Sequence, residues 1–303
     1  MRQTICDALV ARADRQNLVF LTGDLGFMAL EPIRDRLGDR FINCGVAEQN
    51  MVSVAAAMAK EGLEVWAYSI APFCYARAFE QVRNDICMHR LPVRLLGNGG
   101  GYGYGVMGPT HHAVEDYGVL LTLPMRVFVP AFSDDVATLV AGSDTIDGPC
   151  YFRLGRDERT PGAVAPRYAP WRRLSEGNGP VVVTIGPLAS SVQSALMEFG
   201  EPRPEVWLVS ELPLVASQIP LKFIERLSEA RRLCVVEEHV AHGGLGSMLC
   251  RWLAECGISV REFRHLHALS SPPPRSGSQA YMRRESGLDP ESVKAAVAAV
   301  ADL

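Results

Sequence analysis

The chain has 303 residues, 48% of them hydrophobic and 21% charged, and a formal net charge of −4 at pH 7. This length accommodates two domains that each bury a core of their own. Lys and Arg never run beyond a pair, so neither nucleic acid nor an anionic membrane is an evident partner. No apolar run approaches the roughly 20 residues that span a bilayer, and the first residues become charged too early for a secretory signal. The eight cysteines lack C-x-x-C pairs and zinc spacing, which favours reduced thiols in a cytoplasmic protein.

Short apolar runs alternate with helical segments through the first half of the chain. The predicted strands lie at residues 18–21, 41–43, 64–68, 93–96 and 126–129. The predicted helices lie at residues 4–14, 73–87, 113–123 and 133–141, with another that begins near Glu48. This alternation indicates a parallel sheet that helices cover on both faces.

A second α/β set follows residues 153–170, which are rich in Arg, Pro and Gly and are typical of a linker. Its predicted strands lie at residues 181–185, 205–209, 233–236 and 260–263. Its predicted helices lie at residues 190–199, 222–230, 246–256 and 290–300, with a loop at 270–277. We therefore predict an α/β fold of two doubly wound domains with mostly parallel sheets. The first domain is placed at 1–160, the linker at 161–178 and the second domain at 179–303.

The segment 41–60 combines a short strand, a turn at Gly45 and an apolar helix with Glu48 and Gln49 in its first turn. Free N–H groups and the aligned peptide dipoles favour a carboxylate at a helix start, so Glu48 can be a helix-capping acid. The helix is apolar almost all round, which predicts that it is buried. Burying an unpaired charge is costly, so this acid calls for a partner or a function.

Other candidate residues follow the predicted strands. Asp24 comes just after the strand at 18–21, where open α/β sheets place their ligands, although an acid in a turn is often structural. Tyr68 and Phe73 lie in an aromatic segment whose flat faces suit either a ring-shaped ligand or the core.

The glycine-rich segment 97–112 ends in Gly-Pro-Thr-His-His. It formally contains the dinucleotide fingerprint at 103–108, but Pro109 follows where a helix start is expected and no acidic residue closes a second strand. So many glycines instead suggest a backbone that approaches a ligand or partner closely.

The string Gly-Val-Ala-Glu-Gln-Asn-Met-Val-Ser before an Ala-rich helix resembles the pyrimidine-binding domain of transketolase. Several family motifs recur in order, and the likeness covers nearly the whole chain. It implies that Glu48 contacts N1′ of the aminopyrimidine ring of thiamine diphosphate and that Asp24 lies close to the thiamine. It also implies that an aromatic side chain stacks on the pyrimidine, with Phe73 as first choice and Tyr68 as second.

The same resemblance implies that His111, in the Gly-Pro-Thr-His motif, contacts the donor's hydroxyls. An imidazole can also relay protons near neutral pH. His112 is more simply structural. The family also has a substrate-binding arginine near the positions of Arg153 and Arg156. These two residues can clamp an anionic group of the substrate, or they can be solvated charges of the linker.

The sequence departs from the family pattern in two respects. Met107 stands where many transketolases have an Asp that helps to select the acceptor, and Gly99 and Gly100 stand where a basic residue holds substrate phosphate. A sugar phosphate acceptor is therefore in doubt. His239 with His242 and the His265-Leu-His267 pair have no third ligand nearby, so we predict no metal site and structural roles for them.

The chain has no Gly-Asp-Gly of the kind that helps to hold the metal ion of thiamine diphosphate. The resemblance covers only the pyrimidine-binding and C-terminal domains, which implies the C-terminal subunit of a split transketolase. An N-terminal, diphosphate-binding subunit would hold Mg²⁺ or Ca²⁺, with active sites between chains of an α2β2 assembly. The pair would transfer a two-carbon ketol unit from a ketose donor to an aldehyde acceptor, and this chain alone would be inactive.

Three alternatives remain open from the sequence. The β subunit of a 2-oxo-acid dehydrogenase decarboxylase has the same two domains, although Gly-Pro-Thr-His-His favours transketolase. A condensing enzyme similar to deoxyxylulose-phosphate synthase would release carbon dioxide from pyruvate. A regulatory or scaffolding homologue is the non-enzymatic alternative, against which the presence of Glu48 and His111 argues.

Overall fold

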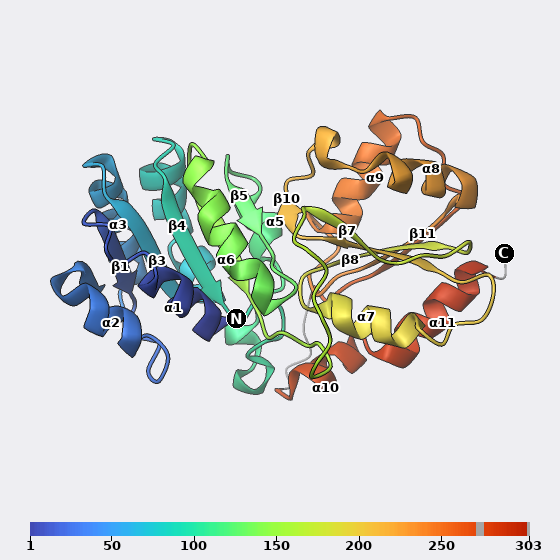
Figure 1. Cartoon of the computed structure of the whole chain (residues 1–303), viewed down its shortest axis with the longest axis horizontal. Coiled ribbons are helices and arrows are strands. Elements are labelled where there is room, and N and C mark those ends of the chain that lie inside the picture. The colour runs from blue at the N-terminus through green and yellow to red at the C-terminus, as the bar shows by residue number, and fades with distance from the viewer. Residues whose placement is uncertain (271–275, 302–303) are drawn as a thin grey trace.

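The computed structural model describes residues 1–270 and 276–301, which form two α/β lobes lying side by side (Figure 1). The first lobe is built on a seven-stranded sheet in the order β10-β5-β6-β4-β3-β1-β2. Its strands are β1 (Leu18–Thr22), β2 (Phe41–Asn43), β3 (Glu64–Ile70), β4 (Val93–Asn98), β5 (Arg126–Phe128), β6 (Cys150–Leu154) and β10 (Glu211–Leu212). Neighbouring strands are parallel except β10, which pairs with β5 in the antiparallel sense. The carboxyl ends of the six parallel strands therefore meet at one edge.

Helices cover both faces of this sheet, as the alternating pattern predicts. The helices of one face are α1 (Arg2–Val10), α2 (Glu31–Leu37) and α6 (Ser133–Gly142). The other face carries α3 (Glu48–Lys60), α5 (Asp116–Leu120) and the helical residues 73–87. Side chains of a strand alternate between faces. Accordingly, Phe20 packs with the α1 side while Val19 and Leu21 pack with the α3 side.

Residues 73–87 form an irregular helix rather than the continuous one predicted. The short α4 (Phe79–Gln81) is flanked by π-helical turns at Phe73–Arg77 and Val82–Cys87. Such wide turns are frequent at functional sites because they redirect side chains. Here the first turn brings Phe73 and Arg77 to the carboxyl edge of the sheet.

The second lobe contains a five-stranded sheet in the order β12-β11-β8-β9-β7. Its strands are β7 (Trp171–Ser175), β8 (Val181–Ile185), β9 (Glu205–Val209), β11 (Arg232–Val236) and β12 (Glu262–Leu266), of which only β7 is antiparallel to its neighbour. The helices are α7 (Leu188–Leu196), α8 (Leu221–Ala230), α9 (Leu245–Glu255), α10 (Gln279–Glu285) and α11 (Pro290–Ala301). The predicted α/β class with mostly parallel sheets is confirmed.

Several elements differ from the prediction. Strands β6 and β10 and helices α2 and α10 were not expected, and β7 lies inside the predicted linker 161–178. The strand predicted at 260–263 is displaced to β12. The loop predicted at 270–277 lies mostly outside the described residues, as do the last two residues of the predicted second domain.

The two lobes share buried residues at their junction. Strand β10 adds to the edge of the first sheet, where Arg126 Nη2 lies 2.7 Å from Glu211 Oε2. A buried ion pair joins Arg172 of β7 to Asp135 of α6 at 2.7 Å. Helix α10 lies below the junction in Figure 1, next to the end of the first sheet. The second lobe therefore contacts the same edge at which the parallel strands of the first lobe end.

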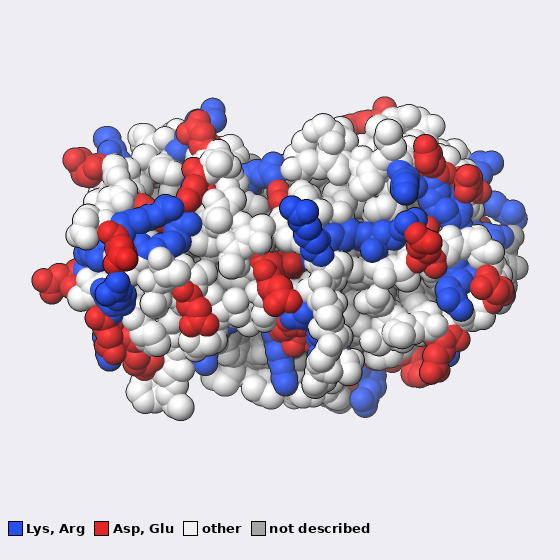
Figure 2. Space-filling view, viewed as in Figure 1, with Lys and Arg blue, Asp and Glu red and all other residues white. Residues whose placement is uncertain are grey.

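Acidic and basic side chains are interspersed over the face that Figure 2 shows. Within residues 1–270 and 276–301, no helix is long and apolar enough to cross a membrane.

Candidate active site

Glu48 begins helix α3 directly after β2, and only 1% of it is exposed. Its Oε1 accepts a hydrogen bond from Ser69 Oγ at 3.0 Å, and its Oε2 accepts one from Arg77 Nη1 at 2.6 Å. A Cβ at Gly23 would lie 3.1 Å from Oε1, so the end of β1 also approaches the carboxylate. Both described bonds are to side chains rather than to the free amides of α3. The carboxylate is therefore engaged across the sheet edge and does not cap its own helix.

Phe73 and His111 are connected to this acid through Arg77. The guanidinium carbon of Arg77 sits 4.1 Å from the centre of the Phe73 ring, a cation–π arrangement. The imidazole of His111 meets the same ring edge-on, with ring centres 5.1 Å apart. Three predicted residues, Glu48, Phe73 and His111, are thus joined through Arg77 into one cluster.

Arg77 received no role from the sequence. It follows Phe73 by four residues, the spacing at which side chains on a helix meet, and that spacing was the available signal. Its side chain is 39% exposed, so it connects the buried carboxylate to the surface. A charged partner of this kind stabilises a buried carboxylate that would otherwise be costly.

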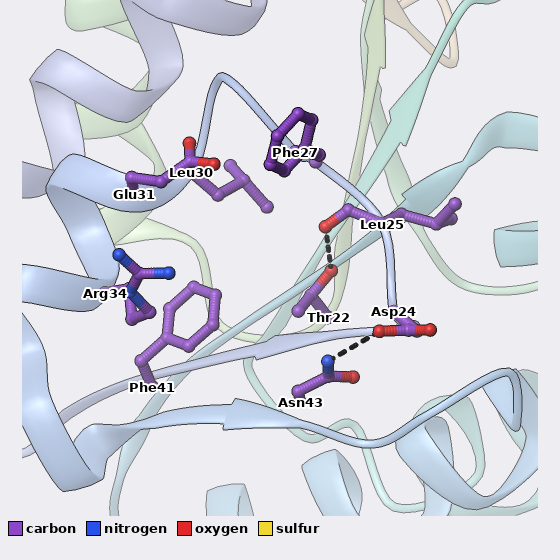
Figure 3. A pocket seen from close by; sticks show the side chains of 10 residues that line it. Thr22, Asp24, Leu25, Phe27, Leu30, Glu31, Arg34, Phe41 and Asn43 are labelled. Atoms are coloured by element: carbon purple, nitrogen blue, oxygen red, sulfur yellow. Dashed lines mark hydrogen bonds between the residues drawn. The ribbon is translucent and has the colours of Figure 1, made fainter.

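Asp24 lies beside the cluster in an exposed turn after β1. Its φ of 58° is unusual for a residue other than glycine, and Asn43 Nδ2 donates a hydrogen bond to its Oδ1 at 2.8 Å (Figure 3). Asp24 lines a pocket of 490 Å³ whose walls include the aromatic rings of Phe27 and Phe41. Met28 in the same turn also has a positive φ, of 60°. Strained residues of this kind cluster at ligand sites.

The structure corrects the prediction that Tyr68 is an alternative stacking residue. Tyr68 is 1% exposed and packs with Phe20 on the α1 side of the sheet. The next residue of β3, Ser69, faces Glu48. Because consecutive strand residues point to opposite faces, Tyr68 faces away from Glu48. Among the two aromatic candidates, only Phe73 lies at the cluster.

The predicted substrate-binding role of Arg153 is also corrected. Arg153 is 6% exposed, its Nε lies 3.0 Å from Asp116 Oδ2, and its Nη2 donates to the carbonyls of Ala113 and Glu238, both at 2.8 Å. Burial alone would lower its pKa, but the neighbouring charge of Asp116 outweighs burial and raises the pKa above the usual range. The guanidinium of Arg153 is therefore bound to groups of this chain inside the junction of the two lobes. Arg156, in contrast, is exposed in the loop after β6.

His112 and His239 have internal contacts, whereas His242 is exposed. His112 is buried against Tyr102, and burial lowers its pKa. His239 stacks on Tyr117 with ring centres 3.8 Å apart, and its Nε2 accepts a hydrogen bond from the Gly118 amide at 3.1 Å. The described residues contain no group of three or more His, Cys, Asp or Glu that could hold a metal ion.

The fold and the cluster define a protein of the transketolase type, with an acid buried at the carboxyl edge of a parallel sheet. The family model for the transketolase pyrimidine binding domain matches residues 1–160, and the chain belongs to this family.

Curated relatives support the assignment. The chain is 30% identical over 274 residues to one of the subunits of apulose-4-phosphate transketolase from Phocaeicola vulgatus, covering 86% of this chain and 85% of the relative. It is 27% identical over 275 residues to the protein of the same name from Actinobacillus succinogenes, with 87% and 86% covered. It is also 31% identical over 288 residues to 1-deoxy-D-xylulose-5-phosphate synthase from Thermomicrobium roseum, but spans only 43% of that protein.

Solved structures agree. A structure described as "Split gene transketolase, inactive beta4 tetramer" matches all of this chain and 98% of its own, with a TM-score of 0.82 and 27% identity. Transketolase from Leishmania mexicana matches 99% of this chain with a TM-score of 0.80 and 20% identity, which shows the shared fold, and this chain covers 45% of it. The prediction of the C-terminal subunit of a split transketolase is confirmed, and the chain is a subunit of a transketolase-type transferase.

Proposed function

We propose that this chain supplies the pyrimidine-binding half of a thiamine-diphosphate-dependent active site that transfers a two-carbon ketol unit from a ketose to an aldehyde. The observation that carries the proposal is the buried Glu48 carboxylate, held by Ser69 and Arg77 beside Phe73 and His111. A carboxylate with 1% exposure is costly to bury, and buried acids with a specific charge partner cluster at functional sites.

The residues fit the pyrimidine end of the cofactor. Glu48 provides a carboxylate that can hold a proton at N1′ of an aminopyrimidine, and Phe73 provides a flat apolar face for the ring. Asp24 provides an exposed acid two residues past the end of β1, next to the glycine that approaches Glu48. When bound, thiamine diphosphate supplies the nucleophilic carbon for breaking and forming the C–C bond, while the protein orients and polarises it.

His111 is placed to serve the substrate. Its imidazole lies at the edge of the Phe73 ring, and its Nδ1 is 3.0 Å from Thr110 Oγ1. The Nε2 atom is therefore the one available to a donor hydroxyl, from which it can take a proton or to which it can return one. Arg156, exposed after β6, remains a candidate for an anionic part of the substrate.

The glycines at 99 and 100 bear on the acceptor. A Cβ at Gly100 would lie 2.4 Å from Arg153 Cγ, and a Cβ at Gly99 would lie 2.2 Å from the ring of Tyr104. A basic side chain therefore has no room at either position while these neighbours stay in place. The family pattern has a basic residue here that holds substrate phosphate. We propose that this chain does not bind a substrate phosphate at this position.

A partner subunit fits the surface around the site. Exposed apolar side chains follow the carboxyl ends of several parallel strands, and they are Phe27 (83% exposed), Met28 (78%), Val46 (74%), Val106 (64%) and Met107 (57%). Exposed apolar groups gathered at one edge favour a protein interface. We propose that this edge meets the N-terminal, diphosphate-binding subunit in an α2β2 assembly, and that this partner holds the diphosphate and its Mg²⁺ or Ca²⁺. The relative described as an inactive β4 tetramer supports a requirement for a second kind of chain.

The eight cysteines are free thiols in the structure, six of them at least partly buried. Thiols of this kind persist in a reducing compartment, so we propose that the enzyme is cytoplasmic.

The decisive experiment mixes this chain with a candidate partner that carries Gly-Asp-Gly, thiamine diphosphate and Mg²⁺, and screens ketose donors against aldehyde acceptors. We expect ketol transfer by the pair and none by either chain alone. Carbon dioxide release from pyruvate would favour a synthase like that of Thermomicrobium roseum, and acyl transfer to a lipoyl group would favour the decarboxylase alternative. Tight stoichiometric binding of thiamine diphosphate by this chain alone would contradict the shared site.

A further inference from the structure

The loop that carries His111 is closed at its base and rich in glycine. The amide of Gly101 donates to the carbonyl of Ala113 at 2.9 Å, and the amide of Ala113 donates back to Gly101 at 2.8 Å. We call residues 101–113 the His111 loop. Glycines have the largest conformational freedom of any residue, so a loop of this composition needs outside contacts to hold one position.

Glu238 provides one such contact from the second lobe. It lies two residues after β11, in the second half of the chain, and is 6% exposed. Its Oε1 accepts a hydrogen bond from the backbone amide of Tyr102 at 2.6 Å, and its Oε2 accepts one from Arg283 Nε at 2.7 Å. A Cβ at Gly101 would lie 2.6 Å from Oε1, so a glycine at this position lets the loop backbone reach the carboxylate.

Helix α10 holds Glu238 from the other side. Gln279 Nε2 donates to Glu238 Oε1 at 3.0 Å. Arg283 also pairs with Glu158, which lies in the loop after β6, with two hydrogen bonds of 2.7 Å. Glu238 is thus a buried carboxylate with donors from the His111 loop and from α10, and charge-assisted bonds of this type are short and directional.

Other parts of the second half hold the same loop. The amide of Gly277 donates to the carbonyl of Gly105 at 3.1 Å. The hydroxyl of Tyr102 lies 2.9 Å from Ser286 Oγ and accepts a hydrogen bond from the Leu269 amide at 3.2 Å. Figure 1 shows α10 below the junction, where these contacts are made. The loop also contacts the first lobe, through the hydrogen bonds from Asn98 to Tyr104 and from Arg153 to Ala113 and through the edge of His111 on Phe73.

We propose that Glu238 is a positioning residue that fixes the His111 loop, so that the C-terminal half of the chain sets where His111 stands relative to Phe73. This inference rests on the proposed function only for the role of His111, because the contacts themselves are independent of it. The second lobe would then help to organise the active site, although this lobe contributes none of the residues of the Glu48 cluster.

The test uses two alanine variants, each of which removes one of the two carboxylates that pair with Arg283. Both variants are measured in the complex with the partner subunit. Glu238→Ala removes the acceptor for the Tyr102 amide, while Arg283 keeps Glu158. The matched control, Glu158→Ala, removes a carboxylate from Arg283 and leaves the Tyr102 contact intact. Amide hydrogen exchange of peptides from the His111 loop is measured together with kcat, KM for the ketose and the affinity for thiamine diphosphate.

We expect Glu238→Ala to raise exchange in the His111 loop and to lower kcat, each by about tenfold or more, as loss of one hydrogen bond to a charged group would do. Cofactor affinity should stay unchanged because the contacts of Glu48 are untouched. Glu158→Ala should leave loop exchange and kcat near those of the wild type. If the alanine variant does not fold, Glu238→Gln, which keeps one acceptor oxygen for Tyr102, should show a smaller change in the same direction.

Unchanged exchange of the loop in Glu238→Ala would overturn the proposal, and so would equal effects of the two alanine variants. A fall in cofactor affinity parallel to the fall in kcat would also overturn it, since general loosening would then explain the result. If the wild-type pair shows no ketol transfer, the proposed function fails, but loop exchange still decides whether Glu238 fixes the loop.

Discussion

The change Glu48→Gln separates the chemistry of the carboxylate from its packing. Gln has nearly the same size, and its amide oxygen can accept the hydrogen bond of Arg77 while its amide nitrogen donates to Ser69 Oγ, whose hydroxyl is free to turn. Both contacts of 2.6 and 3.0 Å therefore survive in altered form. What is lost is the charge on a residue that is 1% exposed.

The expected effect on stability is small because two effects oppose each other. The ion pair with Arg77, whose side chain is 39% exposed, is worth about 1 kcal/mol after screening by solvent. Neutralising a buried carboxylate stabilises the folded state by a similar amount, because the desolvation cost of the charge is removed. We therefore expect the free energy of unfolding to change by no more than about 1 kcal/mol, or about 2 °C in Tm for a chain of this size.

The expected effect on activity is large. A neutral amide cannot hold the proton at N1′ of the aminopyrimidine, and loss of one positioned acid or base costs about 10²–10⁴-fold in rate. Ketol transfer by the reconstituted pair and thermal unfolding of the chain measure the two effects separately. Asp85→Asn is the matched control, since it changes an acid that bonds Ser53 on the same helix α3 at 2.6 Å, and it should leave activity unchanged.

Two outcomes would refute this reasoning. Retention of more than about a tenth of the activity would show that the charge of Glu48 is not needed for the reaction. Unfolding of the variant, with the control intact, would show that the carboxylate is mainly a structural support of α3.

Arg153→Met should lower the free energy of unfolding by about 3–5 kcal/mol, because it leaves the buried Asp116 without its cation; denaturant titration measures this, and added Asp116→Asn should restore part of the loss. His111→Ala should reduce kcat of the pair with Tm unchanged, and a parallel fall in Tm would assign His111 to the fold. Burial tends to raise the pKa of Asp157, but hydrogen bonds from Arg159 and nearby amides outweigh it and lower the pKa to about 2. Asp157 therefore contributes stability above pH 4 that is lost as the pH falls toward 2, about 1 kcal/mol after solvent screening; urea titrations from pH 5 to 2 should show a shallower fall in Asp157→Asn.

The fold was largely predictable because most strands are continuous apolar runs with helical patterns between them. Two of the three missed strands, β6 and β7, contain arginine, while the third, β10, has only two residues. In β6, Arg153 interrupts the run Cys-Tyr-Phe-Arg-Leu, and in β7 two arginines follow Trp171. Each buried arginine is neutralised by an acid far away in the chain, Asp116 for β6 and Asp135 for β7. Local sequence shows the charge but not its partner, so a buried strand was taken for a linker.

The candidate site was predictable where a motif fixes a residue and unpredictable where geometry decides. Glu48 and His111 lie in motifs and meet in the structure through Phe73 and Arg77. Whether Tyr68 or Ser69 faces the site depends on which alternate residues of β3 point to the α3 side of the sheet, and the motif does not specify this. The contact of Glu238 with Tyr102 joins residues 136 positions apart, and no local pattern could have indicated it.

The division of labour within the chain explains how a transketolase site can be shared between two polypeptides. The buried charges near the site have their partners in this chain, Glu48 with Arg77, Asp116 with Arg153 and Glu238 with Arg283. A chain organised in this way satisfies its costly groups on its own, because no buried charge of this set depends on a second polypeptide. The same edge also exposes apolar side chains such as Phe27, Met28 and Val46, and covering apolar surface stabilises an assembly without requiring that either chain be folded by the other.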